Sequence, residues 1–272
     1  MDEKGEYYIT NATGLLWVAN QVNNKINTFS KKTIKLANDI DLINIDWTPI
    51  GLDTWSMFNG VFDGNNKTIS NLKVTRDAGY GNGFFGNLPN GAVVKNVTFD
   101  NALVQRGNKA YSGNCYGIVA GYVYGSSSFE NVHIINSELH GYGKVGPMIG
   151  HSAEPGNYVN SFANCSVTDT DVYGVYNVSG LVGLALQKIK VSMENVTVDV
   201  NFVRSENETY VDLTNAVATE ATSGDTKEFS GNFWVYGQYL YAGIGTYYTD
   251  YEVGDYDYVL EDGRHIAHGE TH

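Results

Sequence analysis

The chain has 272 residues, including 31 glycines, 20 tyrosines and only four prolines, and a formal charge of −13 at pH 7. This acidic excess argues against a nucleic-acid backbone or an anionic membrane surface as the partner. No stretch offers the roughly 20 apolar residues that a membrane-spanning helix needs, so membrane insertion is not expected. The composition suits a turn-rich all-β protein.

Residues 11–26 are the one segment that predicts a helix. Asn11 or Thr13 can cap its first turn, and we expect it to close the exposed end of a β fold rather than to bind a partner. We assign residues 1–30 to this capping region. Residues 1–4 lack the charged-then-apolar layout of a secretory signal. The apolar residues expected on one broad face are Leu15, Leu16, Val18, Ala19, Val22 and Ile26.

One short phrase recurs through the middle of the chain: an apolar residue, any residue, Asn, and then two apolar residues two apart. The phrase places an apolar residue out of phase with the alternation that follows, so the chain must bend at Asn, which enters the left-handed region at low cost. Stacked bends would let the amides hydrogen-bond from coil to coil, about 4.7–4.9 Å apart. The Asn positions step by 25 (96−71), 35 (131−96), 33 (164−131) and 31 (195−164). The predicted Asn ladder is Asn71, Asn96, Asn131, Asn164 and Asn195.

A second mark, a glycine after apolar residues, steps by 35, 29 and 33 at positions 86, 121, 150 and 183. Repeats with a period of about 20 to 50 residues indicate a solenoid. We therefore predict an all-β fold: a single-stranded right-handed parallel β-helix over residues 31–203. We expect an N-terminal capping α-helix and a Tyr-rich C-terminal β cap to flank it.

Several runs in the first coils resemble a known family: residues 34–42 (IKLANDIDL), 47–51 (WTPIG), 58–74 (FNGVFDGNNKTISNLKV) and 83–86 (GFFG). They are similar to the opening module of bacterial surface proteins that carry GLUG repeats, and residues 180–183 (GLVG) resemble the repeat itself. The resemblance covers roughly residues 11–203. It implies a right-handed parallel β-helix within a large extracellular protein, often an adhesin and sometimes a stalk attached to a protease of the immunoglobulin-A type. It brings no agreed catalytic residues.

Residues 204–272 are acidic at first and then rich in tyrosine. Tyr and Trp offer a large apolar face with a polar tip, which suits an interface. The segment reads as a cap on the last coil, as a platform for glycan or protein, or as an oligomer contact, and the sequence does not set the oligomeric state. The candidate binding residues are Trp234, Tyr236, Tyr239, Tyr241, Tyr247 and Tyr248.

Acidic residues and histidines supply the candidates for chemistry. Asp41 and Asp63 could act as a catalytic carboxylate pair, and with Asp39 and Asp46 they could instead hold Ca²⁺ or serve as turn residues. His265 and His268 have a spacing compatible with metal ligation, but Gly269 and the terminal position favour a frayed tail instead. No cofactor is expected, with Ca²⁺ as an option.

The leading interpretation is a non-enzymatic extracellular adhesin or stalk on a bacterial cell surface, which presents loops and an aromatic surface to a glycan or a surface protein. One alternative is a carbohydrate-active β-helix, a lyase or hydrolase that uses the Asp-bearing face. A further alternative is a bacteriophage virion fibre or decoration protein on the virion surface.

Overall fold

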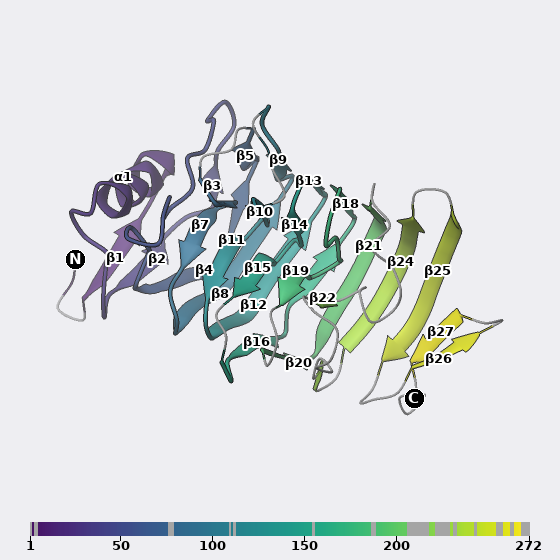
Figure 1. Ribbon diagram of the computed structural model, residues 1–272. Helices are drawn as coiled ribbons and strands as arrows, with labels where there is room; N and C mark the ends of the chain where they lie inside the picture. Colours follow the sequence, from purple (N-terminus) through teal and green to yellow (C-terminus); the bar gives the residue numbers. More distant parts are fainter. Residues whose placement is uncertain are drawn as a thin grey trace.

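The chain winds into a parallel β-solenoid whose coils stack from the N-terminal end toward the C-terminal end (Figure 1). This computed structural model describes residues 2, 5–75, 79–108, 110, 113–153, 156–185 and 189–205, and then the strand backbones 218–220, 229–230, 233–241, 244–253, 258–261 and 264–267. The side chains of residue 190, of residue 202 and from residue 204 onward lie outside this description. The predicted all-β solenoid is confirmed.

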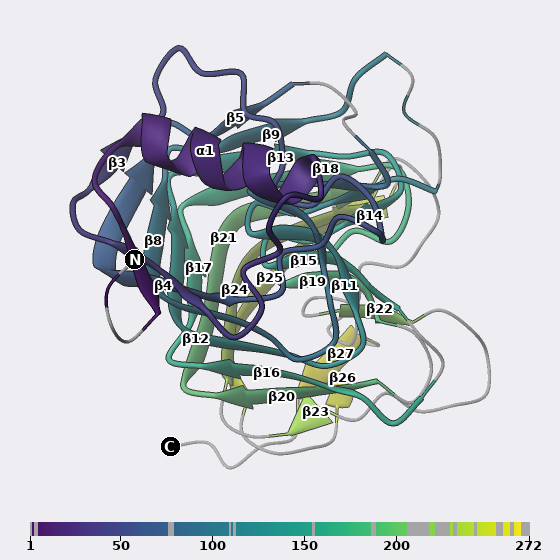
Figure 2. The same ribbon diagram turned by 90° about the vertical axis from the view of Figure 1, so that its left-hand side faces the viewer.

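Helix α1 (Ala12–Asn23) lies across the N-terminal end of the stack (Figure 2). The Asn11 side chain caps it by accepting from the Gly14 backbone nitrogen at 3.1 Å. Leu16 and Ile26 are 40% and 65% exposed, contrary to the predicted face, because Leu16 is turned about 100° from Leu15 and the helix ends before Ile26. No helix in the described ranges is long and apolar enough to cross a bilayer. The buried face consists of Leu15, Val18, Ala19 and Val22.

Each coil contributes strands to several stacks, which we call legs and number in chain order. The first leg contains β1 (Glu6–Ile9), β2 (Thr33–Leu36), β4 (Val61–Ser70), β8 (Ala92–Asp100), β12 (Ser127–Ile135), β16 (Val159–Ala163), β20 (Lys190–Glu194) and β23 (Phe229–Ser230). The second leg contains β3 (Ile40–Asp41), the later parts of β4, β8 and β12, then β17 (Ser166–Thr168), β21 (Val196–Ser205) and β24 (Phe233–Tyr241).

The third leg contains β5 (Lys73–Val74), β9 (Leu103–Gln105), β13 (Ser137–His140), β18 (Thr170–Gly174) and the end of β21. The fourth contains β6 (Gly81–Asn82), β10 (Cys115–Tyr116) and β14 (Lys144–Val145). The fifth contains β7 (Phe85–Leu88), β11 (Ala120–Tyr124), β15 (Ile149–Ala153), β19 (Val182–Ala185) and β22 (Ala218–Glu220). All pairs within the five legs are parallel. Beyond them, β25 (Ile244–Val253) runs antiparallel to β24, and β26 (Tyr258–Glu261) pairs antiparallel with β27 (Arg264–Ala267).

Asn71 does not belong to the predicted Asn ladder. Each coil bends twice, and Asn71 stands at the second bend, where it aligns with Asn101 and accepts from the Asn101 amide at 2.6 Å. The pairing of Ile69 with Phe99 fixes this register. At the first bend of that coil, two residues with positive φ, Asn65 and Asn66, replace the single Asn found later. The short step of 25 residues therefore joins two different bends, since Asn71 stands at the second bend and Asn96 at the first. Along the second bend itself, the step from Asn71 to Asn101 is 30 residues (101−71).

The other four ladder residues stand at the first bend with φ between 53° and 56°. Asn131 donates to Asn96 Oδ1 at 3.2 Å, and Asn195 donates to Asn164 Oδ1 at 2.8 Å. These contacts offset the cost of the left-handed backbone and link neighbouring coils.

The recurrent glycines allow the fourth and fifth legs to touch backbone to backbone. A Cβ on Gly121 would overlap the backbone of Gly81 and Asn82 in the preceding coil, and one on Gly183 would overlap the backbone nitrogen of Val145. No residue with a side chain fits at this approach. The glycine series is thus a packing requirement, because the turn between these legs brings their backbones together.

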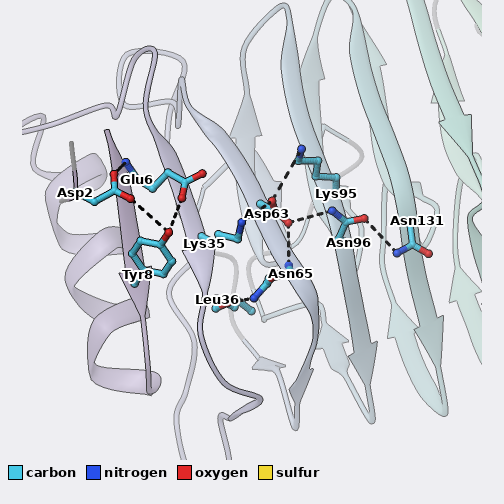
Figure 3. Close-up of polar contacts among 10 residues, drawn as sticks. All are labelled: Asp2, Glu6, Tyr8, Lys35, Leu36, Asp63, Asn65, Lys95, Asn96 and Asn131. Atoms are coloured by element: carbon cyan, nitrogen blue, oxygen red, sulfur yellow. Dashed lines mark hydrogen bonds and ion pairs between the residues drawn. The ribbon is translucent and has the colours of Figure 1, made fainter. Parts of the chain in front are cut away.

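Aromatic side chains fill the interior of the first coils. Trp47 is fully buried, its ring stacks on Phe84 with centroids 5.1 Å apart, and its indole Nε1–H donates to the Phe84 carbonyl at 3.0 Å. At the N-terminal edge, Tyr8 Oη donates to Glu6 Oε2 at 2.6 Å, and Asp2 Oδ1 accepts from the Glu6 backbone nitrogen at 2.9 Å (Figure 3). Charged groups on an edge strand disfavour pairing with another chain.

Candidate functional site

Asp63, one of the two carboxylates proposed for catalysis, lies in a network of local contacts at the first bend (Figure 3). Its Oδ1 accepts from the Asn65 backbone nitrogen at 2.9 Å and from the Asn96 amide at 3.1 Å. Lys35 and Lys95, from the coils on either side, each place Nζ 3.9 Å from its Oδ2. The carboxylate is nearly buried, and these contacts suit a residue that ties three coils together.

Asp41 stands at the second bend, away from Asp63. It accepts from the Asn71 amide at 2.7 Å and from the Ile43 backbone nitrogen at 2.8 Å, and these hydrogen bonds lower the pKa of its carboxyl. Residues 67–70, which separate the two bends, span about 13 Å at about 3.3 Å each. Paired carboxylates in glycosidases lie about 5–9.5 Å apart, so this arrangement does not form such a pair.

The two remaining acidic candidates also make local contacts. Asp39 accepts from the Thr68 backbone nitrogen at 2.9 Å, and Asp46 accepts from the Thr75 hydroxyl at 3.2 Å. Across the described ranges, no group of three or more His, Cys, Asp or Glu side chains is placed to hold a metal ion.

The tail candidates are placed only through their backbones. Trp234 and Tyr236 in β24 lie opposite Thr197 and Asp199, and Tyr239 lies opposite Val203. Tyr241 ends β24, Tyr247 and Tyr248 belong to β25, and His265 belongs to β27. Their side chains, and His268 altogether, lie outside the described residues. The tail platform and the histidine metal site stay predictions.

Six side chains gather on the outside of the third leg and at its end, where they span three coils. His140 in β13 pairs with Tyr173 in β18, and their rings stack with centroids 4.5 Å apart and planes 11° apart. Tyr142 and Tyr176 meet edge to face at 5.7 Å, and the Arg106 guanidinium lies 5.5 Å from the centre of the Tyr142 ring. We call this set the aromatic strip; it consists of Arg106, Glu138, His140, Tyr142, Tyr173 and Tyr176.

Backbone hydrogen bonds hold the strip in place. The Arg106 backbone nitrogen donates to the His140 carbonyl at 2.7 Å, and that of Tyr176 donates to the Tyr142 carbonyl at 3.1 Å. Glu138 Oε2 lies 3.1 Å from His140 Nε2, while the Glu138 side chain stays 60% exposed. The two ring pairs and the cation–π contact are therefore held by the backbone pairing of neighbouring coils, and such preorganisation lowers the entropic cost of binding.

A smaller buried cluster, separate from the main core, includes residues of the fourth and fifth legs: Tyr122 in β11 packs against Cys115 in β10 and against Tyr80. Burial raises the pKa of the Cys115 thiol to about 12. Burial, with the Lys144 charge, lowers the pKa of His151 to about 3. A nucleophilic Cys–His pair needs a thiolate, and both shifts favour the neutral forms. The cluster therefore does not favour covalent catalysis by a Cys–His pair.

Sequence reasoning missed the aromatic strip, although a signal was present. His140 and Tyr173 each stand ten residues before the recurrent glycine of their coil (150−140 and 183−173) and each precedes a glycine directly. This shared spacing predicts that the two rings meet in adjacent coils.

No family model matches the chain. Halomucin from Haloquadratum walsbyi is 33% identical over 135 residues, which cover 46% of this chain and 1% of halomucin. The chain thus corresponds to a very small part of that relative. The fold also resembles a crystal structure from Bacteroides ovatus that is provisionally described as an immunoglobulin A1 protease. The match covers 98% of this chain and 84% of the Bacteroides chain, with a TM-score of 0.52 and 19% sequence identity. That likeness concerns the fold alone.

Proposed function

We propose that this chain is a non-enzymatic extracellular module, an adhesin or stalk segment of the GLUG type on a bacterial surface, which binds a glycan or a surface protein. The observation that carries the proposal is the aromatic strip: partly exposed rings and polar groups held rigidly on one side of a regular solenoid. Aromatic side chains with a polar tip are enriched where proteins bind partners.

Two further observations support the proposal. The four acidic candidates use their oxygens for local contacts within and between coils. The stretch similar to halomucin, a protein whose name denotes a mucin, fits an extracellular setting.

Two experiments test this function. Protease treatment of intact cells that produce the natural gene product should remove the protein from the surface, and labelled protein should bind saturably to target cells in competition with unlabelled protein. Protein that is accessible only after lysis, or binding that does not saturate, would contradict the proposal. Recovery in virus particles would instead support the virion alternative. Release of reducing sugar ends that Asp41→Asn abolishes would support the enzyme.

A further inference from the structure

We propose that the aromatic strip binds a neutral oligosaccharide whose chain runs along the solenoid axis. This inference rests on the proposed function and adds the ligand class and the site. It concerns Arg106, Glu138, His140, Tyr142, Tyr173 and Tyr176 rather than the tyrosines of the tail.

The strip combines the two kinds of group that a sugar requires. A pyranose ring has apolar C–H faces, which pack on aromatic rings, and hydroxyl groups, which need fixed hydrogen-bond donors and acceptors. Tyr142, Tyr173 and Tyr176 are partly exposed rings. The exposed carboxylate of Glu138 is a hydrogen-bond acceptor, and the guanidinium of Arg106, which lies over the Tyr142 ring, carries five N–H donors in a planar fork.

The register of the coils sets the direction of the ligand. Arg106, Tyr142 and Tyr176 come from three successive coils, as do Gln105, His140 and Tyr173. Neighbouring coils are about 4.8 Å apart, so the strip extends about 10 Å across the strands. A single sugar covers part of this length, whereas an oligosaccharide that lies along the axis contacts all three coils. Affinity should therefore rise with the length of the glycan.

The charges favour a neutral glycan. The chain carries a formal charge of −13. Glu138 and Asp171 face each other in register on the third leg, and the Arg106 guanidinium already lies over Tyr142. The acidic excess of the whole chain disfavours sulfated and sialylated chains. Binding that depends on ring packing and hydrogen bonds should also change little between low and high salt.

The alternative reading is that the rings pack only on each other and on the core, as Tyr142 does in part, and stabilise the coils from outside. The test uses the full chain, the double variant Tyr173→Leu/Tyr176→Leu, and the matched control Tyr124→Leu. Leu keeps apolar volume but removes the aromatic face. Tyr124 is 37% exposed and belongs to the fifth leg, outside the strip.

The proteins would be screened on an array of neutral and anionic oligosaccharides, followed by calorimetry with mono-, di- and trisaccharides of the best neutral series. We expect salt-independent binding that strengthens with length. The double variant should weaken it by at least about tenfold, with Tyr124→Leu unchanged. Circular dichroism checks the fold of each variant. If the double variant unfolds, Glu138→Ala replaces it, and saturation-transfer NMR on the unaltered protein shows whether tyrosine rings touch the sugar.

Three results would overturn the inference. If neutral glycans bind the folded double variant and the unaltered protein equally well, the glycan site lies outside the strip. The strip would then no longer support the proposed function, although glycan binding itself would still agree with it. Binding restricted to anionic glycans would refute the ligand class. The third result is that no glycan binds, while the protein still binds target cells and protease treatment of those cells abolishes the binding. This result would indicate a protein ligand and would leave the proposed function standing.

Discussion

Stability should fall with pH below about 6.5 because of one buried histidine, His151 in β15. Burial, with a smaller effect of the Lys144 charge, lowers its pKa to about 3. Among the described residues, its Nε2 finds no hydrogen-bond partner, and its Nδ1 lies 3.5 Å from Tyr80 Oη. In the unfolded chain the ordinary pKa is about 6.5.

The sign follows from the lowered pKa. Above about pH 6.5 the imidazole is neutral in both states and contributes no pH dependence. As the pH falls from about 6.5 to about 3, the His151 imidazole binds a proton in the unfolded chain but stays neutral in the folded protein, so the folded state loses stability relative to the unfolded one. At about pH 5 the difference is about 1.5 pKa units, or about 2 kcal/mol at about 1.36 kcal/mol per unit.

Urea unfolding followed by circular dichroism at about pH 7.5 and about pH 5 measures this loss in the unaltered protein and in His151→Gln. The unaltered protein should lose about 2 kcal/mol more than the variant between the two pH values, because carboxylates titrate in both and cancel. His133→Gln should also lose less stability between the two pH values than the unaltered protein does, since burial lowers the pKa of His133 as well. An equal loss in the unaltered protein and in His151→Gln would refute the reasoning.

Three pairs of substitutions test the architecture by the same unfolding assay. Gly121→Ala should cost more than about 4 kcal/mol or prevent folding, because its Cβ would overlap backbone, whereas Gly91→Ala, in open space with φ 83°, should cost about 1–2 kcal/mol. Asn164→Ala should lower the free energy of unfolding by about 1–3 kcal/mol, because it removes the amide contact with Asn195 and places Ala at a positive φ. Asn164→Gly should lower it less, because Gly tolerates the positive φ. A larger loss for Gly than for Ala would contradict the ladder. Asp63→Ala, which deprives two lysines of their partner, should cost about 1–2 kcal/mol and Asp63→Asn less. Loss of glycan binding in a stable Asp63→Asn variant would contradict its local role.

The sequence predicted the parallel stack because the interior repeats. Val94, Phe129, Phe162 and Met193 were aligned from the phrase alone, and the strands pair them in that order. The same phrase failed at Asn71 for a physical reason. Both bends of a coil use a residue in the left-handed region followed by alternating apolar residues, so a single phrase fits either bend. In this coil the first bend is marked by residues 64–66, which lie opposite the single Asn96 of the next coil. This difference is seen only once the strands are paired.

The aromatic strip could not be found by composition. The tyrosines of the tail are dense in sequence, whereas the strip draws single rings from coils more than thirty residues apart. Its formation depends on which residues the coil lengths bring into register, and loop length varies before the fourth leg. Gln105 stands sixteen residues before its glycine (121−105), whereas His140 and Tyr173 each stand ten residues before theirs. In a solenoid the loops can change length while the strands stay aligned, because each coil pairs only with its neighbours. The recurrent glycine of each coil is the fixed reference point, because its contact with neighbouring backbone allows no shift. When spacing is counted back from that glycine, His140 and Tyr173 occupy equivalent positions in adjacent coils.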